Sequence, residues 1–317
     1  MPRSLLALSA FLLAALAGCK PGGIPTTGLT NPDGKTLLAD APKGFATKLA
    51  RQHKAGDPVD VPPPSVFRTV QYDAPVGKCA AYLTPDPKDG KKRPAIVWIT
   101  GGDCNTIGDV WKPAPPSNDQ SARQFREAGV VMMFPSLRGG NQNPGFQENF
   151  YGEVDDVLAA AEFLAKQDFV DPARIYLGGH STGGTLVMLV AAVPNKFRAV
   201  FSFGPAEDIS GYEEQYRPAV NMRDAREVEL RSPGRWLHSI QTPTFVFEGT
   251  DGNADSLKAM ANTSKNPKAH FYLVKGASHF SILTPVNKLI AQRVIADTGT
   301  ETNLTFTEAE LNKLFGR

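Results

Sequence analysis

The stretch GGHSTGG, from Gly178 to Gly184, places one serine, Ser181, among four glycines directly after a short apolar run. Glycine lacks a Cβ atom and lets the backbone turn sharply, so the pattern fits a tight turn between a strand and a helix. Such a turn lifts a serine hydroxyl out of the backbone, and the N–H groups of the new helix then face any anion that forms there. A glycine-rich turn without chemistry is the alternative, and the rest of the chain has to decide between the two.

The composition indicates a globular protein with a sizeable core. The chain has 317 residues, of which 41% are hydrophobic. Its 34 lysines and arginines against 32 aspartates and glutamates leave a net charge of +2. This even balance, without a prominent basic run, argues against a nucleic-acid partner.

The first residues are typical of an export signal. A positive start precedes a short apolar run, residues 4–16, which is too short to span a membrane comfortably. The run ends in Leu16-Ala17-Gly18-Cys19, which resembles the bacterial lipoprotein processing box, and an ordinary signal with a chance cysteine is the alternative. We expect residues 1–18 to be a signal peptide and a lipid on Cys19 to anchor the protein in the bacterial cell envelope. In Gram-negative lipoproteins an Asp directly after the cysteine often signals retention in the inner membrane. Lys20 stands in that place here, so we expect the outer membrane, on its periplasmic or surface face.

Two further cysteines, Cys79 and Cys104, lie beyond this segment. An exported protein meets an oxidising compartment, so a disulfide between them is one expectation. Two unlinked, partly buried thiols are the other, because sequence alone does not supply the geometry that a disulfide needs.

The rest of the chain divides at residue 64. Residues 19–64 are rich in Pro, Gly, Thr and Lys and predict a tether, with a short helix near residues 45–53. From residue 65 to 317, apolar runs of strand length alternate with helical patterns, which predicts one α/β domain with a mostly parallel central sheet and helices on both faces. The predicted strands are residues 67–72, 78–83, 94–99, 130–134, 175–177, 199–203, 244–247 and 270–274. The predicted helices are residues 121–128, 151–166, 185–193, 254–264 and 285–296, with a last one that begins at a capping box formed by Thr307 and Glu310.

A serine nucleophile needs a base, because an unassisted hydroxyl is weakly nucleophilic at neutral pH. Of the five histidines, His279 lies in a loop just after the last predicted strand, at the edge where sites of open α/β sheets form. His180 is next to Ser181 in the chain, and the turn sends the two side chains different ways. We therefore predict that His279 is the base and that His180 is a wall residue.

The base in turn needs a carboxylate that orients its ring and stabilises its positive charge. Asp251 follows the strand at residues 244–247 and is our first candidate, with Asp255 and Glu248 as the second choices. A helix cap or a surface charge is the alternative role for each of them.

An oxyanion hole requires backbone N–H groups beside the nucleophile. Thr182 directly follows the serine and supplies one. The other comes from the pair of glycines after the strand at residues 94–99, with Gly102 preferred over Gly101. The sequence has no metal-ligand spacing and no phosphate-binding glycine loop, so it implies no cofactor and no metal.

From about residue 67 to the C-terminus the chain resembles an α/β-hydrolase and is most similar to the catalytic domain of the prolyl oligopeptidase family. The order serine, acid, histidine matches that fold. The segments that carry the resemblance are residues 96–102, 136–140, 155–157, 179–184, 232–237, 242–243 and 276–279. The resemblance implies a serine hydrolase that cleaves ester or peptide bonds through an acyl-enzyme.

Three features depart from that family. The residues before the domain are a tether and a short segment instead of a large β-propeller. Thr100 stands where prolyl oligopeptidase uses a tyrosine for its oxyanion, and one residue instead of two separates Gly249 from Asp251. These departures weigh against proline-directed cleavage and leave ester hydrolysis and peptide hydrolysis both open. A non-catalytic envelope lipoprotein that uses the fold for binding is the remaining alternative.

Overall fold

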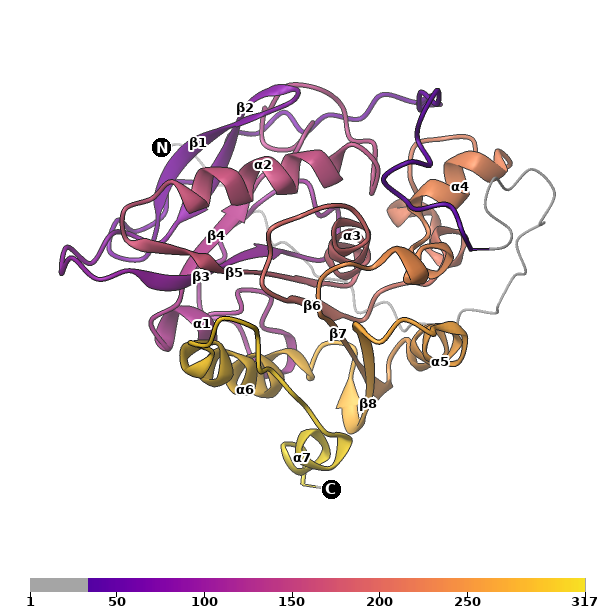
Figure 1. Cartoon of the computed structure of the whole chain (residues 1–317). Helices are drawn as coiled ribbons and strands as arrows, with labels where there is room; N and C mark the ends of the chain where they lie inside the picture. The colour runs from indigo at the N-terminus through magenta and orange to yellow at the C-terminus, as the bar shows by residue number, and fades with distance from the viewer. Residues whose placement is uncertain (1–33, 317) are drawn as a thin grey trace, which may run out of the picture.

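The computed structural model describes residues 34–316 and contains one eight-stranded sheet with helices on both faces (Figure 1). The strands are β1 Arg68–Ala74, β2 Gly77–Leu83, β3 Arg93–Ile99, β4 Val131–Pro135, β5 Val170–His180, β6 Val200–Phe203, β7 Thr244–Asp251 and β8 Ala269–Ser278. Their order across the sheet is β1-β2-β4-β3-β5-β6-β7-β8. Pairing is antiparallel from β1 through β2 to β4 and parallel from there to β8. The predicted mostly parallel sheet is confirmed.

Apart from α4, the helices lie where the sequence predicts them. They are α1 Gln124–Glu127, α2 Glu153–Ala165, α3 Thr182–Ala191, α4 Ala225–Arg231, α5 Ala254–Thr263, α6 Leu283–Ala296 and α7 Glu308–Lys313. Short 3₁₀ turns lie at Pro116–Asn118, Ile209–Gly211, Glu214–Tyr216, Pro233–Arg235 and Leu237–Ser239. The predicted capping box is present, since the Thr307 hydroxyl accepts from the Glu310 N–H and the Glu310 carboxylate accepts from the Thr307 N–H. Helix α4 was not predicted.

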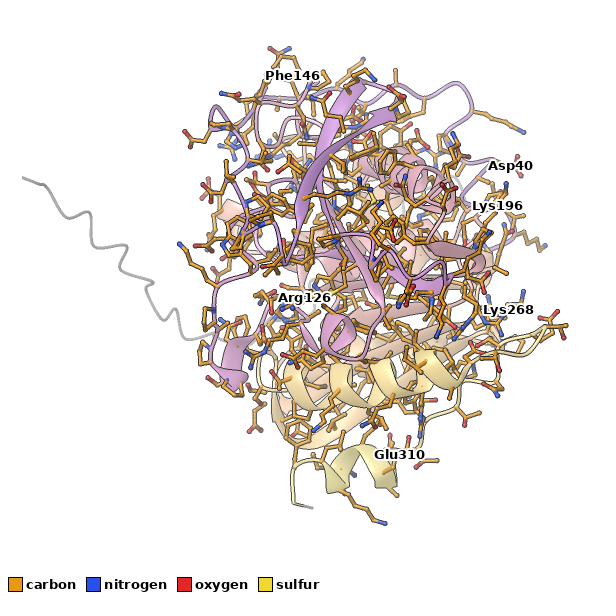
Figure 2. The ribbon with its side chains drawn as sticks, turned by 90° about the vertical axis from the view of Figure 1, so that its left-hand side faces the viewer. Asp40, Arg126, Phe146, Lys196, Lys268 and Glu310 are labelled. Atoms are coloured by element: carbon orange, nitrogen blue, oxygen red, sulfur yellow. The ribbon has the colours of Figure 1, made fainter. Side chains whose placement is uncertain are left out.

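The sheet separates two apolar cores, because alternate side chains of a strand point to opposite faces. In β3, Val97 and Ile99 belong to the core under α2, α3 and α5, whereas Ile96 and Trp98 belong to the core over α1 and α6. Figure 1 shows α2 and α3 on one side of the central strands and α1 and α6 on the other. Both faces are buried, so the carboxyl-terminal edge of the sheet is left for a site. In Figure 2, Phe146 and Glu310 mark opposite ends of the molecule.

Residues 34–64 lie against the domain, and the helix predicted near residues 45–53 is absent. Leu49 instead forms an isolated antiparallel bridge with Val220. The buried carboxylate of Glu227 in α4 accepts hydrogen bonds from the Thr47 hydroxyl at 2.9 Å and the Lys48 N–H at 2.7 Å. A backbone N–H used in this way is not available to a helix, so long-range contacts override the local pattern. The division of the chain at residue 64 stays a prediction.

Cys79 and Cys104 are both buried and unlinked, so the expected disulfide is not formed and the alternative of two free thiols holds. Burial raises the pKa of the Cys79 thiol to about 12, and burial also raises the pKa of Cys104 well above its usual range. Both groups are therefore protonated and unreactive near neutral pH. The predicted signal peptide and Cys19 lie outside the described residues.

Candidate active site

Ser181 is the single residue between β5 and α3. Its backbone angles, φ 56° and ψ −117°, lie in a region that costs a residue with a side chain about 1–3 kcal/mol. The turn is held on both sides, because the Ser181 N–H donates to the Phe203 carbonyl at 2.7 Å and the Thr185 N–H donates to the Ser181 carbonyl at 2.9 Å. The predicted strand–turn–helix around the serine is present.

Close backbone approach explains the glycines that flank this serine. A Cβ atom on Gly179 would lie 2.5 Å from the Gly183 carbonyl oxygen. A Cβ atom on Gly183 would overlap the carbonyl oxygen of Ile99, at the end of β3. The backbones of β3, α3 and the turn at Ser181, which we call the nucleophile elbow, thus pack directly on one another. No residue larger than glycine fits at either position.

His279 lies directly after β8 and contacts a buried carboxylate. Its Nδ1 is 2.9 Å from Oε2 of Glu248, and both side chains are buried. The Glu248 carboxylate also accepts from the Gly249 N–H at 2.7 Å and from the Asn253 N–H at 3.0 Å. These backbone donors fix the carboxylate. It then accepts the Nδ1–H of the imidazole, which leaves Nε2 as the basic nitrogen.

The structure corrects the choice of carboxylate. Glu248 is paired with Leu273 across β7 and β8, and a register shift follows before Asp251 pairs with Ser278. Asp251 is exposed beyond this shift. Asp255, the other second choice, lies in the first turn of α5 with its side chain in solvent, 3.3 Å from the Lys258 ammonium.

One signal in the sequence could have identified Glu248. Phe245 and Phe247 alternate along β7 and belong to the core over α6. Glu248 therefore lies on the opposite side of the strand, at the end of a buried run in which a carboxylate is rare without a partner. One residue instead of two separates Gly249 from Asp251, but this difference from the family did not by itself point to Glu248 as the acid.

The predicted oxyanion residues surround Ser181. Thr182 is the first residue of α3, so its N–H has no acceptor within the helix. The Thr182 hydroxyl donates to the Gly102 carbonyl at 2.9 Å, which ties the elbow to the loop after β3. A Cβ atom on Gly101 would lie 3.2 Å from the Ser181 Cβ, so this glycine lies directly beside the serine. The arrangement can present backbone N–H groups to an anion formed at the serine.

His180 is fully buried behind the site, as a wall residue would be. Its ring is centred 4.5 Å from that of His279, and its Nε2 lies 3.0 Å from the His279 carbonyl oxygen. Its Nδ1 lies 3.0 Å from Oε1 of Gln120, a residue that sequence reasoning missed. Burial, reinforced by the neighbouring His279, lowers the pKa of His180 well below its usual range. His180 is therefore neutral near pH 7.

A buried ion pair supports the loops next to the site. Arg138 donates from Nε and Nη2 to the two carboxylate oxygens of Asp156, each at 2.9 Å, and from Nη1 to Glu148 at 2.7 Å. The Asn105 side chain donates to the Arg138 carbonyl at 2.8 Å and to Glu153 at 2.9 Å. These contacts join the loop after β4 to the loop after β3, which carries Gly101.

Residues 34–316 contain no group of three or more His, Cys, Asp or Glu side chains that could hold a metal ion. Within the same part of the chain, no helix has both the length and the apolar character to cross a membrane.

Comparison with known proteins gives a family and a fold. The family model described as prolyl oligopeptidase family matches residues 116–292, which is more than half of the chain. Dipeptidyl-peptidase 5 of Porphyromonas gingivalis is 30% identical over 192 residues, 53% of this chain and 27% of that protein. The uncharacterized peptidase YtmA of Bacillus subtilis is 28% identical over 179 residues, 53% of this chain and 66% of that protein. The chain thus spans about a quarter of the first relative's length and just under two thirds of the second's.

Solved structures share the architecture. An acylaminoacyl peptidase of Pyrococcus horikoshii gives a TM-score of 0.61 at 14% identity, over 77% of this chain and 44% of that chain. A puromycin-hydrolyzing peptidase of Mycobacterium tuberculosis gives 0.58 at 21% identity, over 73% of this chain and 39% of that chain. An esterase of Pyrobaculum calidifontis gives 0.53 at 16% identity, over 73% of this chain and 85% of that chain. The predicted α/β-hydrolase fold is confirmed.

Proposed function

The chain belongs to the prolyl oligopeptidase family, and from this premise and the geometry of its site we propose that it is a serine hydrolase with the triad Ser181, Glu248 and His279. The observation that carries the proposal is the 2.9 Å contact between His279 Nδ1 and the buried Glu248 carboxylate, beside a serine held in a strained turn. Strained backbone and buried charge are costly, and they persist where a reaction needs them.

The reaction follows from these contacts. His279 Nε2 removes the hydroxyl proton of Ser181 as its oxygen attacks an ester or amide carbonyl. The resulting imidazolium is stabilised by the Glu248 carboxylate, whose orientation the N–H groups of Gly249 and Asn253 maintain. Backbone N–H groups of Thr182 and of the Gly101–Gly102 pair stabilise the oxyanion. His279 then protonates the leaving group, and water releases the acyl-enzyme by the same steps.

We propose ester and peptide bonds in accessible substrates as the substrate class. Family membership supports peptide hydrolysis, and the likeness of the fold to that of an esterase supports ester hydrolysis. A panel of aryl esters and peptide amides separates the two. Turnover of esters alone contradicts the peptidase, and turnover of amides at comparable kcat/KM supports it.

The experiment that tests the site is labelling by a fluorophosphonate probe, with turnover of an aryl ester measured in parallel. Ser181→Ala should lose labelling and at least ~10⁴-fold of kcat, because the residual rate then comes from binding and the oxyanion donors alone. Ser117→Ala, at an exposed serine outside the site, is the matched control and should keep both. Full turnover in folded Ser181→Ala contradicts the assignment, and no labelling of folded wild type supports the non-catalytic alternative.

An envelope location with a lipid on Cys19 is a second proposal, supported by the processing box that precedes that cysteine. Metabolic labelling with an alkyne fatty acid should mark the wild type and not Cys19→Ala. Equal labelling of both proteins, or recovery of the wild type in the soluble fraction, contradicts the anchor.

A further inference from the structure

Gln120 links the candidate base to the candidate oxyanion loop through His180. Its Oε1 lies 3.0 Å from His180 Nδ1 and accepts the Gly101 N–H at 3.4 Å. On the other side of the ring, His180 Nε2 faces the carbonyl oxygen of His279 at 3.0 Å. One chain of contacts therefore runs from Gly101 through Gln120 and His180 to the backbone of the base.

The protons on this chain are constrained. The His279 carbonyl only accepts, so His180 Nε2 must carry its hydrogen. Burial lowers the pKa of His180 well below its usual range, so the ring is neutral and Nδ1 carries no hydrogen. A bare Nδ1 needs a donor, and an amide oxygen at 3.0 Å is not one.

A half-turn of the Gln120 carboxamide resolves the conflict. The amide oxygen and nitrogen have nearly the same shape, and the hydrogen-bond network decides which one occupies each place. With Nε2 turned toward His180, the ring nitrogen gains its donor. The Gly101 N–H then faces an NH₂ group, has lost its acceptor and is free beside Ser181. In the structure, Gln120 Nε2 donates to Asn118 Oδ1 at 3.0 Å. The Asn118 amide is exposed and can turn in the same way.

We propose that Gln120 is a positioning residue that, set by His180, controls whether the Gly101 N–H serves the oxyanion hole. With neutral His180, the carboxamide presents its NH₂ group to the ring and releases the Gly101 N–H. With charged His180, Nδ1–H donates to the amide oxygen, which then also holds the Gly101 N–H. This inference rests on the proposed hydrolase function of the same site.

The surroundings of His180 decide the direction of its response to pH. The titratable group that faces it is His279, from the loop after β8, with Glu248 of β7 behind. Phe280, whose ring is centred 5.5 Å away, and Gln120 carry no charge. A proton on His279 opposes a proton on His180. The orientation in which the Gln120 amide oxygen holds the Gly101 N–H is therefore reached only on the acid side of the activity profile.

Two substitutions at Gln120 separate this role from a structural one. Gln120→Glu supplies only acceptor oxygens, which hold the Gly101 N–H and favour a proton on His180. We expect kcat to fall on the order of 100-fold with KM little changed, the size of effect seen when one oxyanion donor is lost. Gln120→Met leaves the Gly101 N–H without an acceptor and should keep kcat within about fivefold. Glutamate matches glutamine in shape more closely than methionine does, yet Gln120→Glu should be the slower enzyme.

Ser117→Glu adds the same charge at an exposed position nearby and should keep kcat within about twofold, which controls for a general electrostatic effect. A second readout is the acid limb of log kcat/KM against pH. In the wild type, protonation of His180 engages the Gly101 N–H and steepens the acid limb. In Gln120→Met the limb should lose this added steepness, a change that a packing role does not produce.

Equal kcat for folded Gln120→Glu and Gln120→Met overturns the proposal. If Gln120→Glu does not fold, an unchanged acid limb in Gln120→Met overturns it alone. Either result with Ser181 still labelled by the fluorophosphonate leaves the proposed function intact, whereas turnover in Ser181→Ala contradicts the function itself.

Discussion

The nucleophile elbow, at the end of β5, and the acid–base pair, at the ends of β7 and β8, lie at the same edge of the sheet but are held in different ways. Ser181 is fixed by its own backbone, in a turn where Gly179 and Gly183 allow main chain to touch main chain. Glu248 and His279 are fixed by partners that are distant in sequence, at the ends of β7 and β8. Local geometry builds the first, and the tertiary fold builds the second.

The strain is accordingly stored in different forms. At the elbow it is a backbone conformation that only a rigid strand and helix can impose. At the pair it is a buried carboxylate, which is costly to bury and is surrounded by His279 and two backbone N–H groups. A substitution that adds one methyl group to either region should therefore break it for a different reason.

Gly183→Ala should have the largest effect, because it disrupts the elbow itself. Alanine in a helix usually stabilises it by about 0.5–1 kcal/mol relative to glycine. Here the added methyl would overlap the Ile99 carbonyl oxygen and lie 2.6 Å from that of Thr100, and both are backbone atoms of the strand end. We expect a loss of about 3 kcal/mol or more in unfolding free energy and loss of labelling at Ser181. Urea unfolding and probe labelling measure the two.

Gly108→Ala is the control for this change, because nothing lies within 4 Å of the added methyl. It should leave stability and labelling near the wild type. A fully stable and active Gly183→Ala contradicts the close backbone approach at the elbow.

Gly204→Ala should disturb the acid–base pair with less damage to the fold. Its methyl would overlap the His279 ring at Cε1 and lie 2.8 Å from Glu248 Oε2, and a φ of 57° disfavours any side chain there. The imidazole is a side chain and can move, so we expect kcat to fall on the order of 100-fold while the enzyme stays folded. Gly211→Ala, with open space around its methyl, is the matched control. Equal kcat in the two variants would show that the ring is not held where the pair requires it.

Asp297→Asn should change stability and leave turnover unchanged. Like Glu248, Asp297 is a buried carboxylate, but it accepts from Arg198 at 2.7 Å and from Tyr176 at 2.7 Å, away from the site. Burial raises its pKa, but the hydrogen bonds from Arg198, Tyr176 and Thr302 outweigh this and lower the pKa to about 2. Loss of the pair should cost about 3 kcal/mol at pH 7.

The dependence on pH has a definite sign. The folded pKa of Asp297 lies below its usual value of 3.8, so its contribution to stability is present above about pH 4 and is lost as the pH falls toward 2. The difference in unfolding free energy between wild type and Asp297→Asn should therefore be constant from pH 7 to 5 and shrink below pH 4. A difference that grows on acidification contradicts the assignment.

The contrast between the two regions also explains what the sequence could predict. The elbow is encoded within seven residues, so its strand, turn and helix follow from GGHSTGG. The strands and most helices follow from apolar runs, which is why β3, β4 and α2 fall within a residue or two of their predicted ends.

The acid was harder to predict because its place depends on the register between β7 and β8. A shift after Gly249 turns Asp251 to solvent, and no local pattern reports such a shift. Gln120 gave no signal at all, since a lone glutamine in a loop acquires a role only when the fold brings it to His180. The helix expected near residue 47 was wrong for the same reason, because the Glu227 carboxylate, 179 residues away along the chain, accepts the Lys48 N–H.

The most direct test of the triad compares Glu248→Gln with Asp251→Asn by turnover of an aryl ester, with thermal unfolding as the check on folding. The glutamine amide would donate to His279 Nδ1 and leave the ring in the wrong tautomer for proton removal at Nε2. We predict that kcat falls ~10³–10⁴-fold in Glu248→Gln and stays within about twofold of the wild type in Asp251→Asn, where an exposed charge is lost. The reverse order, with Asp251→Asn inactive and folded Glu248→Gln active, would contradict the account.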